Sequence, residues 1–76
     1  MGKKNFSYDK VLSRKFGQKI TNLRKQLEIS QEELAFRANI SPSYMSAIER
    51  GITDTTLSTA KRISKGLKVN LCDLLP

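Results

Sequence analysis

Apolar residues recur along this chain at the spacing of amphipathic helices. Four of them are separated by four, three and four residues, so they share one face of a long first helix. This face consists of Phe16, Ile20, Leu23 and Leu27. Ser7 or Asp9 would cap the start of that helix. Gly17 lies within it and would let a neighbouring helix come close.

A second helix is predicted from Ser30 to about Ala38. Ser30-Gln-Glu-Glu33 has the pattern of a capping box, in which the Ser30 hydroxyl and the Glu33 carboxylate each accept a backbone N–H. The inward residues would be Leu34, Ala35 and Ala38. Asn39 is a plausible left-handed residue at the helix end, and Ile40 would enter the core.

A third helix follows after about three residues. Ser41 is a good N-cap, and Pro42 fits the first helical position because its missing N–H would be unpaired there anyway. Met45 and Ile48 form its apolar stripe, and Gly51 ends it. The Ser-Pro pair therefore fixes where this helix begins.

The remaining chain predicts a fourth helix and a short last one. Thr56 would cap the fourth helix. Its inward face would be Leu57, Ala60, Ile63 and Leu67. Asn70 and Asp73 repeat the capping pattern before a last helix over residues 71–75. The pattern is therefore all-α, with residues 1–7 as a basic flexible arm and residues 8–76 as one domain.

Charge and composition narrow the function. Fourteen Lys and Arg against seven Asp and Glu give a net charge of +7, which favours an acidic partner such as nucleic acid. Cys72 is the only cysteine and there is no His, so we expect no disulfide, no metal and no cofactor. No apolar run approaches a membrane span, and the N-terminus has no apolar signal segment. We expect a cytoplasmic protein without a membrane partner.

The segment QEELAFRANISPSYMSAIERG, Gln31 to Gly51, resembles the lambda-repressor-like (Cro/Xre-type) helix-turn-helix family. The likeness extends over roughly Phe16 to Leu75 and implies a compact five-helix domain with the helix-turn-helix at its second and third helices. Asn39 and Lys68 stand where many members have Gly, and Lys68 leaves the end of the fourth helix open.

The resemblance implies that the third helix enters the major groove of DNA. The expected base-contacting residues are Pro42, Ser43, Tyr44, Ser46 and Ala47. Serine hydroxyls discriminate weakly between bases, whereas Ala47 and Pro42 can touch a thymine methyl. For Tyr44 the alternative is packing against Arg50 or the loop before the fourth helix.

Phosphate contacts are expected at two places: the start of the second helix, where free N–H groups favour anions, and the region from the third helix to the fourth. The expected residues are Ser30, Gln31, Ser41, Arg50, Thr53, Thr55 and Thr56. The Gln31 side-chain contact is implied by the resemblance. Lys3 and Lys4 of the arm would either reach an adjacent groove or stay solvated.

The resemblance also implies a structural ion pair between Arg24 and Glu49, which would fix the angle of the third helix. Related proteins bind as twofold dimers. The expected dimer surface is Val69, Leu71, Leu74 and Leu75, a set more apolar than a short terminal helix requires. The choice among these four stays open.

The predicted function is a sequence-specific regulator of transcription that binds a palindromic double-stranded DNA operator as a homodimer. No small-molecule ligand is expected, and analogy favours a restriction–modification controller. The alternative is an adaptor or antitoxin-like module on the same fold whose main partner is another protein. An enzyme is not expected, since no nucleophile arrangement or Gly-rich phosphate loop is present. RNA binding is less favoured because there is no aromatic stacking platform.

Overall fold

The computed structural model describes residues 9–75, which form four α-helices followed by one turn of 3₁₀-helix. The elements are α1 (Lys10–Gln26), α2 (Gln31–Ala38), α3 (Pro42–Arg50), α4 (Leu57–Gly66) and η2 (Leu71–Leu74). The all-α prediction is confirmed, although the expected fifth α-helix is a 3₁₀ turn. Its N–H groups bond three residues back, as in Leu75 to Cys72. The arm predicted over residues 1–7 lies outside the described residues.

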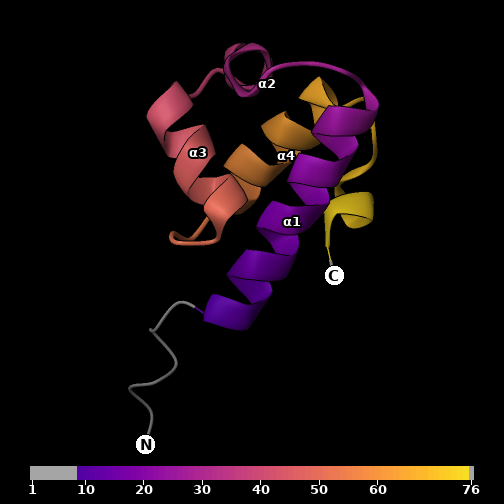
Figure 1. Ribbon diagram of the computed structural model, residues 1–76. Coiled ribbons are helices and arrows are strands. Elements are labelled where there is room, and N and C mark those ends of the chain that lie inside the picture. Colours follow the sequence, from indigo (N-terminus) through magenta and orange to yellow (C-terminus); the bar gives the residue numbers. More distant parts are fainter. Residues whose placement is uncertain (1–8, 76) are drawn as a thin grey trace, which may run out of the picture.

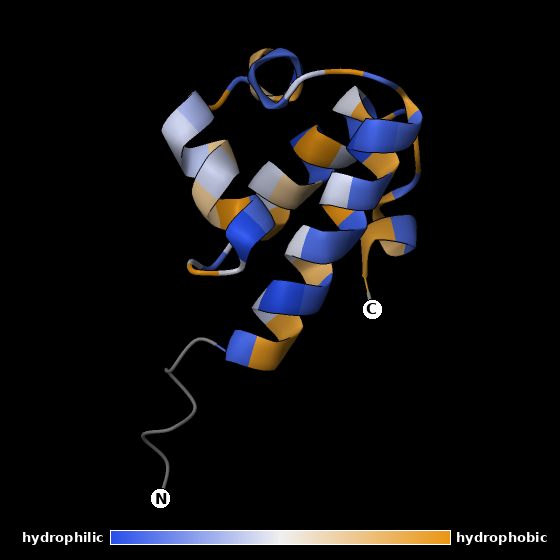
Figure 2. Cartoon of the chain, viewed as in Figure 1, coloured by the Kyte–Doolittle hydropathy of each residue, from blue (hydrophilic) through white to orange (hydrophobic). Residues whose placement is uncertain are grey.

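The helices enclose one apolar core. α1 packs against α3, and α2 packs against both α3 and α4 (Figure 1). The core consists of Phe16, Ile20, Leu34, Ala35, Ala38, Met45, Ile48, Ala60, Ile63, Leu67 and Leu74. Figure 2 shows apolar residues on α4, which appears between α1 and α3 in this view. Each large side chain buried here contributes roughly 1.5–3 kcal/mol, and α4 packs directly against α2 and η2.

The N-terminal helix begins at its predicted cap. The Asp9 carboxylate accepts the Leu12 N–H at 3.0 Å, and Phe16 and Ile20 are buried as expected. The predicted stripe stops at Leu23, because Leu27 lies at the C-cap and is 40% exposed. Gly17 allows a close approach, as predicted. A Cβ at this position would lie 2.4 Å from the Ile48 carbonyl oxygen of α3.

The two helices of the corner have the predicted ends. Asn39 is left-handed, with a φ of 58°, and Ser41 caps α3 by accepting the Tyr44 N–H. The capping box is only half formed. Ser30 accepts the Glu33 N–H at 2.9 Å, but the Glu33 carboxylate pairs with Arg37 at 3.0 Å. The prediction failed there because a cation one turn along the helix takes the carboxylate.

The fourth helix begins at its predicted cap, since Thr56 accepts the Thr59 N–H. Leu57 was predicted to face inward but is 74% exposed. It is the first helical residue, and the core-facing side of α4 starts with Thr59 and Ala60 instead. Lys68 adopts a φ of 60°. It takes the left-handed conformation after α4 that glycine adopts most easily.

Two arginines fasten α2 to α4. Arg62 Nε donates to the Ala38 carbonyl at 2.9 Å, and Arg37 Nη1 donates to the Gly66 carbonyl at 3.0 Å. Each cation therefore lies at the C-terminal, partly negative end of the other helix. These two guanidinium groups stabilise the support behind the corner.

Candidate nucleic-acid interface

One side of α3 is buried and the other is open. Met45 and Ile48 face the core, whereas Pro42 and Ser43 are exposed. Ser46 and Ala47 are half-buried. Spacings of three and four residues place Pro42, Ser43, Ser46 and Ala47 on neighbouring parts of one helical face. The open face of α3 is therefore small and uncharged.

Tyr44 differs from the other expected base contacts. Its side chain is half-buried against the core, and its hydroxyl donates to the Asp54 carbonyl at 3.4 Å. The contact reaches the loop between α3 and α4, which was the alternative interpretation for this residue. Tyr44 therefore holds that loop against α3.

Three of the expected phosphate contacts are helix caps. Ser30, Ser41 and Thr56 each accept the backbone N–H three residues ahead. Thr56 also donates to the Thr59 hydroxyl at 3.0 Å. The two serine hydroxyls accept a bond as caps, so their own protons can still be donated to another acceptor.

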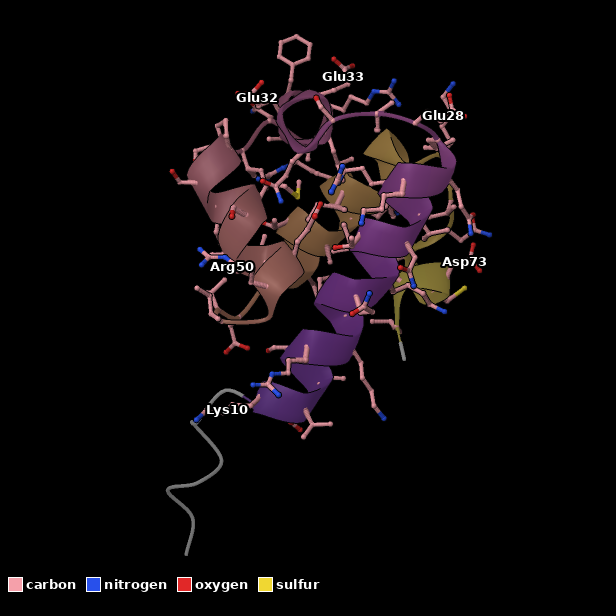
Figure 3. The ribbon with its side chains drawn as sticks, viewed as in Figure 1. Lys10, Glu28, Glu32, Glu33, Arg50 and Asp73 are labelled. Carbon is pink, nitrogen blue, oxygen red and sulfur yellow. The ribbon has the colours of Figure 1, made fainter. Side chains whose placement is uncertain are left out.

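The other four expected phosphate contacts lie at separate positions. Gln31 is half-buried at the start of α2, and Arg50 is exposed at the end of α3. Arg50 projects outward from α3 in Figure 3, and its Nε lies 3.4 Å from the Ser46 carbonyl oxygen. Thr53 and Thr55 are half-buried in the following loop. Of these four residues, one therefore lies at the start of α2 and three lie at or just after the end of α3.

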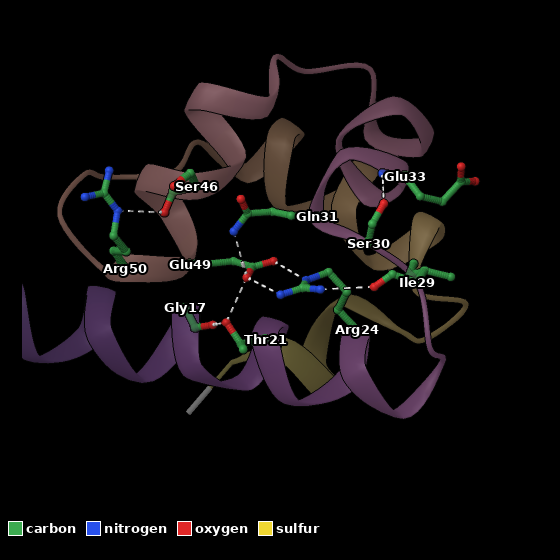
Figure 4. A network of polar contacts seen from close by, with 10 residues as sticks. All are labelled: Gly17, Thr21, Arg24, Ile29, Ser30, Gln31, Glu33, Ser46, Glu49 and Arg50. Atoms are coloured by element: carbon green, nitrogen blue, oxygen red, sulfur yellow. Dashed lines mark hydrogen bonds and ion pairs between the residues drawn. The ribbon is translucent and has the colours of Figure 1, made fainter.

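Arg24 and Glu49 form a largely buried ion pair. Arg24 Nε lies 2.8 Å from Glu49 Oε2 and Arg24 Nη2 lies 3.0 Å from Oε1 (Figure 4). Their side chains are 14% and 5% exposed. Arg24 Nη1 also donates to the Ile29 carbonyl. The guanidinium therefore connects α1, the segment before α2, and α3.

Two further side chains donate hydrogen bonds to the Glu49 carboxylate, and the sequence analysis did not predict them. Thr21 Oγ1 lies 3.0 Å and Gln31 Nε2 lies 3.1 Å from Glu49 Oε1. Thr21 is three residues before Arg24, so the helical period could have indicated that both face α3. Nothing in the local sequence indicates the Gln31 contact, which depends on how α2 and α3 cross.

The expected dimer surface needs revision. Leu74 is fully buried in the core, which corrects its assignment to an exposed surface. Val69 and Leu71 are half-buried and pack on the core, whereas Leu75 is 49% exposed. Leu75 instead borders an apolar groove with Leu12 and Leu57, which are 50% and 74% exposed. Phe16 and Ala60, which are both buried, also line this groove.

The described residues contain neither a metal-binding cluster nor a membrane-spanning helix. Within residues 9–75, His, Cys, Asp and Glu side chains form no group of three that could hold a metal ion. Across the same span, no helix has the length and apolar character that crossing a membrane requires.

Comparison with known proteins identifies the family. Residues 20–74 match the helix-turn-helix family model. The chain belongs to the helix-turn-helix family. This match begins at Ile20 and includes α2, α3, α4 and η2.

The helix-turn-helix relatives include several controller proteins. Over 61 residues the chain is 43% identical to control protein C.BamHI of Bacillus amyloliquefaciens, covering 79% of this chain and 75% of that one. It is 36% identical to control protein C.MunI of a Mycoplasma species, over 79% and 82% of the two chains. The restriction-modification controller C.AhdI of Aeromonas hydrophila superposes with a TM-score of 0.81 at 32% identity, covering 83% and 96%. These relatives are regulatory proteins, not enzymes.

Proposed function

We propose that the chain binds a double-stranded DNA operator with α3 in the major groove and thereby regulates transcription. The observation that carries this proposal is the open face of α3, whose small side chains stand on a helix fixed at its other end by a buried ion pair. In helix-turn-helix proteins the N-terminal residues of the second helix contact base edges in the major groove, and Pro42 and Ser43 are exposed at this position. The net charge of +7 supports attraction to phosphate.

The proposed contacts divide by position. Base edges would be met by Pro42, Ser43, Ser46 and Ala47, with Tyr44 at the border of this face. Phosphates would be met by Ser30, Gln31, Ser41, Arg50, Thr53, Thr55 and Thr56. No Arg, Asn or Gln precedes Arg50 in α3, so the strongest bidentate base readers are missing. Specificity would therefore depend strongly on DNA shape and on the register set by phosphate contacts.

We also propose that the chain acts as a homodimer on a palindromic site. One short helix makes few base contacts, and twofold dimers place two such helices about 34 Å apart. The groove between Leu12, Leu57 and Leu75 supports this, because it exposes three leucines on a small chain. Val69 and Leu71 remain as secondary candidates. Leu74 supports the interface from within the core.

The proposed biological role is that of a restriction-modification controller. The support is the likeness to C.BamHI, C.MunI and C.AhdI, which are named as control or controller proteins. Such a role is consistent with a small DNA-binding chain in the cytoplasm. Activation and repression are both compatible with the proposed DNA contact.

One observation favours the alternative of a protein-binding module. Phe36 on α2 is 81% exposed, and an aromatic side chain in that position is a good anchor for a protein partner. Substituting Phe36 would disrupt such a partnership but leave DNA binding by α3 intact. This keeps the two functions separable.

Selection of duplexes from a random pool tests the proposal. We expect the chain to enrich a site with twofold symmetry, with half-sites separated by about one helical turn. Enrichment of asymmetric single half-sites would contradict the dimer but keep the DNA contact. Failure to enrich any sequence would contradict the proposed function and favour a protein partner.

A further inference from the structure

The Glu49 carboxylate receives hydrogen bonds from three residues of two helices. Its Oε1 accepts from Thr21 and Arg24 of α1 and from Gln31 of α2, and its Oε2 accepts from Arg24. Figure 4 shows Gln31 and Thr21 on opposite sides of the carboxylate. With 5% of its side chain exposed, Glu49 depends on these donors because a buried polar group without hydrogen-bond partners is costly.

Gln31 occupies an unusual place in this network. It is the first residue of α2, whereas Glu49 lies next to the last residue of α3. Its Nε2 lies 3.1 Å from Glu49 Oε1, so this bond joins the start of one helix directly to the end of the other. The bond therefore restrains the angle between the two helices of the corner.

We propose that Gln31 is a positioning residue that links phosphate contact at α2 to the orientation of α3. The amide nitrogen carries two protons. Glu49 accepts one, and the other is free for a phosphate at the start of α2. A phosphate bound there would keep the Gln31 amide in the orientation that donates to Glu49. Because Glu49 belongs to α3, this bond would fix the orientation of α3. This inference rests on the proposed DNA binding and adds a role for Gln31 in discriminating between sequences.

The two roles of Gln31 have different consequences. Every duplex presents the same phosphates, so a residue that only contacts phosphate changes affinity for all sequences alike. A residue that sets the angle of α3 changes base contacts, which exist only on the preferred site. Loss of stability lowers the folded fraction for both duplexes equally. A change in the ratio of specific to non-specific affinity therefore reports a change in the orientation of α3, separately from phosphate contact and stability.

The experiment measures the affinity of the full chain for its selected duplex and for a scrambled duplex. Gln31→Met keeps the length of the side chain and removes the amide. We expect it to lower the affinity ratio about tenfold, as for loss of a hydrogen bond to a charged group. Thr21→Val removes the opposite donor from α1, outside the proposed DNA contacts. We expect about a threefold lower ratio, because the Thr21 hydroxyl is shared with the Gly17 carbonyl.

Arg50→Gln is the matched control, since Arg50 is a proposed phosphate contact with no bond to Glu49 among those described. It should weaken both duplexes alike and reduce the salt slope by about one. An equal loss on both duplexes for Gln31→Met, with Thr21→Val unchanged, would overturn the inference while the proposed function stands. A wild-type chain with no preferred duplex would refute the proposed function itself.

Discussion

The two ends of α3 differ in almost every physical respect. At its C-terminal end, Ile48 is 1% exposed, the Glu49 side chain is 5% exposed, and Gly51 adopts a φ of 72° against α1. At its N-terminal end, Pro42 and Ser43 are exposed and carry no charge. The C-terminal end of α3 is therefore its anchored end, and the exposed N-terminal end is its presented end. Substitutions of the buried residues at the first end should therefore affect folding, and those at the second should affect recognition.

The largest effect is expected at the anchored end. Glu49→Ala would leave the Arg24 guanidinium buried without its counter-charge, and the free energy of unfolding should fall by about 3–5 kcal/mol. Denaturant unfolding followed by circular dichroism measures this. Glu32→Ala on the exposed side of α2 is the control and should stay within about 0.5 kcal/mol. Similar stabilities for the two variants would refute the anchoring role of Glu49.

Gly17→Ala should have the next largest effect. Its Cβ would meet the backbone oxygens of Ile48 and Glu49 at 2.4 and 2.6 Å, so α1 and α3 must separate. We expect a loss of about 1–3 kcal/mol, typical of overpacking, despite the better helix propensity of Ala. Thermal unfolding tests this.

Gly66→Ala is the matched helical control for Gly17. The atoms nearest to a Cβ there would be side-chain atoms of Arg37 and Leu34, each at 3.1 Å. The change in stability should therefore be smaller than for Gly17→Ala. Equal losses would show that the backbone contact with α3 is not the cause.

The groove should govern assembly without affecting the fold. Leu57→Asp places a charge on a side chain that is 74% exposed, so the monomer should remain folded while dimer dissociation rises about tenfold or more. Sedimentation equilibrium measures this. Phe36→Asp, an equally exposed apolar site on α2, should leave the dimer unchanged. Dimers that resist Leu57→Asp would place the interface elsewhere.

The smallest effect is expected at the presented end. Ser43→Ala removes one hydroxyl from the open face and should change preference at a base pair by about three- to tenfold, less than a bidentate contact provides. Binding to a series of single-base variants of the selected site measures this. Ser58→Ala on α4 should leave preference unaltered. An unchanged profile for Ser43→Ala would remove this residue from the reading surface.

Much of the scaffold was predictable because its signals are local. Caps at Ser30, Ser41 and Thr56, and the left-handed Asn39, follow from side-chain chemistry within a few residues. The failures depend on longer-range packing or on competition. Leu57 faces solvent because the core-facing side of α4 begins later, and Glu33 leaves its capping box for Arg37.

The site was predictable only in outline. The period of α3 separates its core side from its open side, and the resemblance paired Arg24 with Glu49. The Gln31–Glu49 bond and the groove of Leu12, Leu57 and Leu75 join residues far apart in sequence. Such contacts are set by the crossing of helices, which no single helical pattern specifies.

Affinity for the selected and scrambled duplexes at several salt concentrations tests most directly whether α3 reads DNA. Tight binding to the selected duplex is expected, with a log–log salt slope reflecting on the order of 6–10 phosphate contacts. The scrambled duplex should bind at least about a thousandfold more weakly at physiological salt. Equal, weak binding to both duplexes even at low salt would contradict recognition by α3.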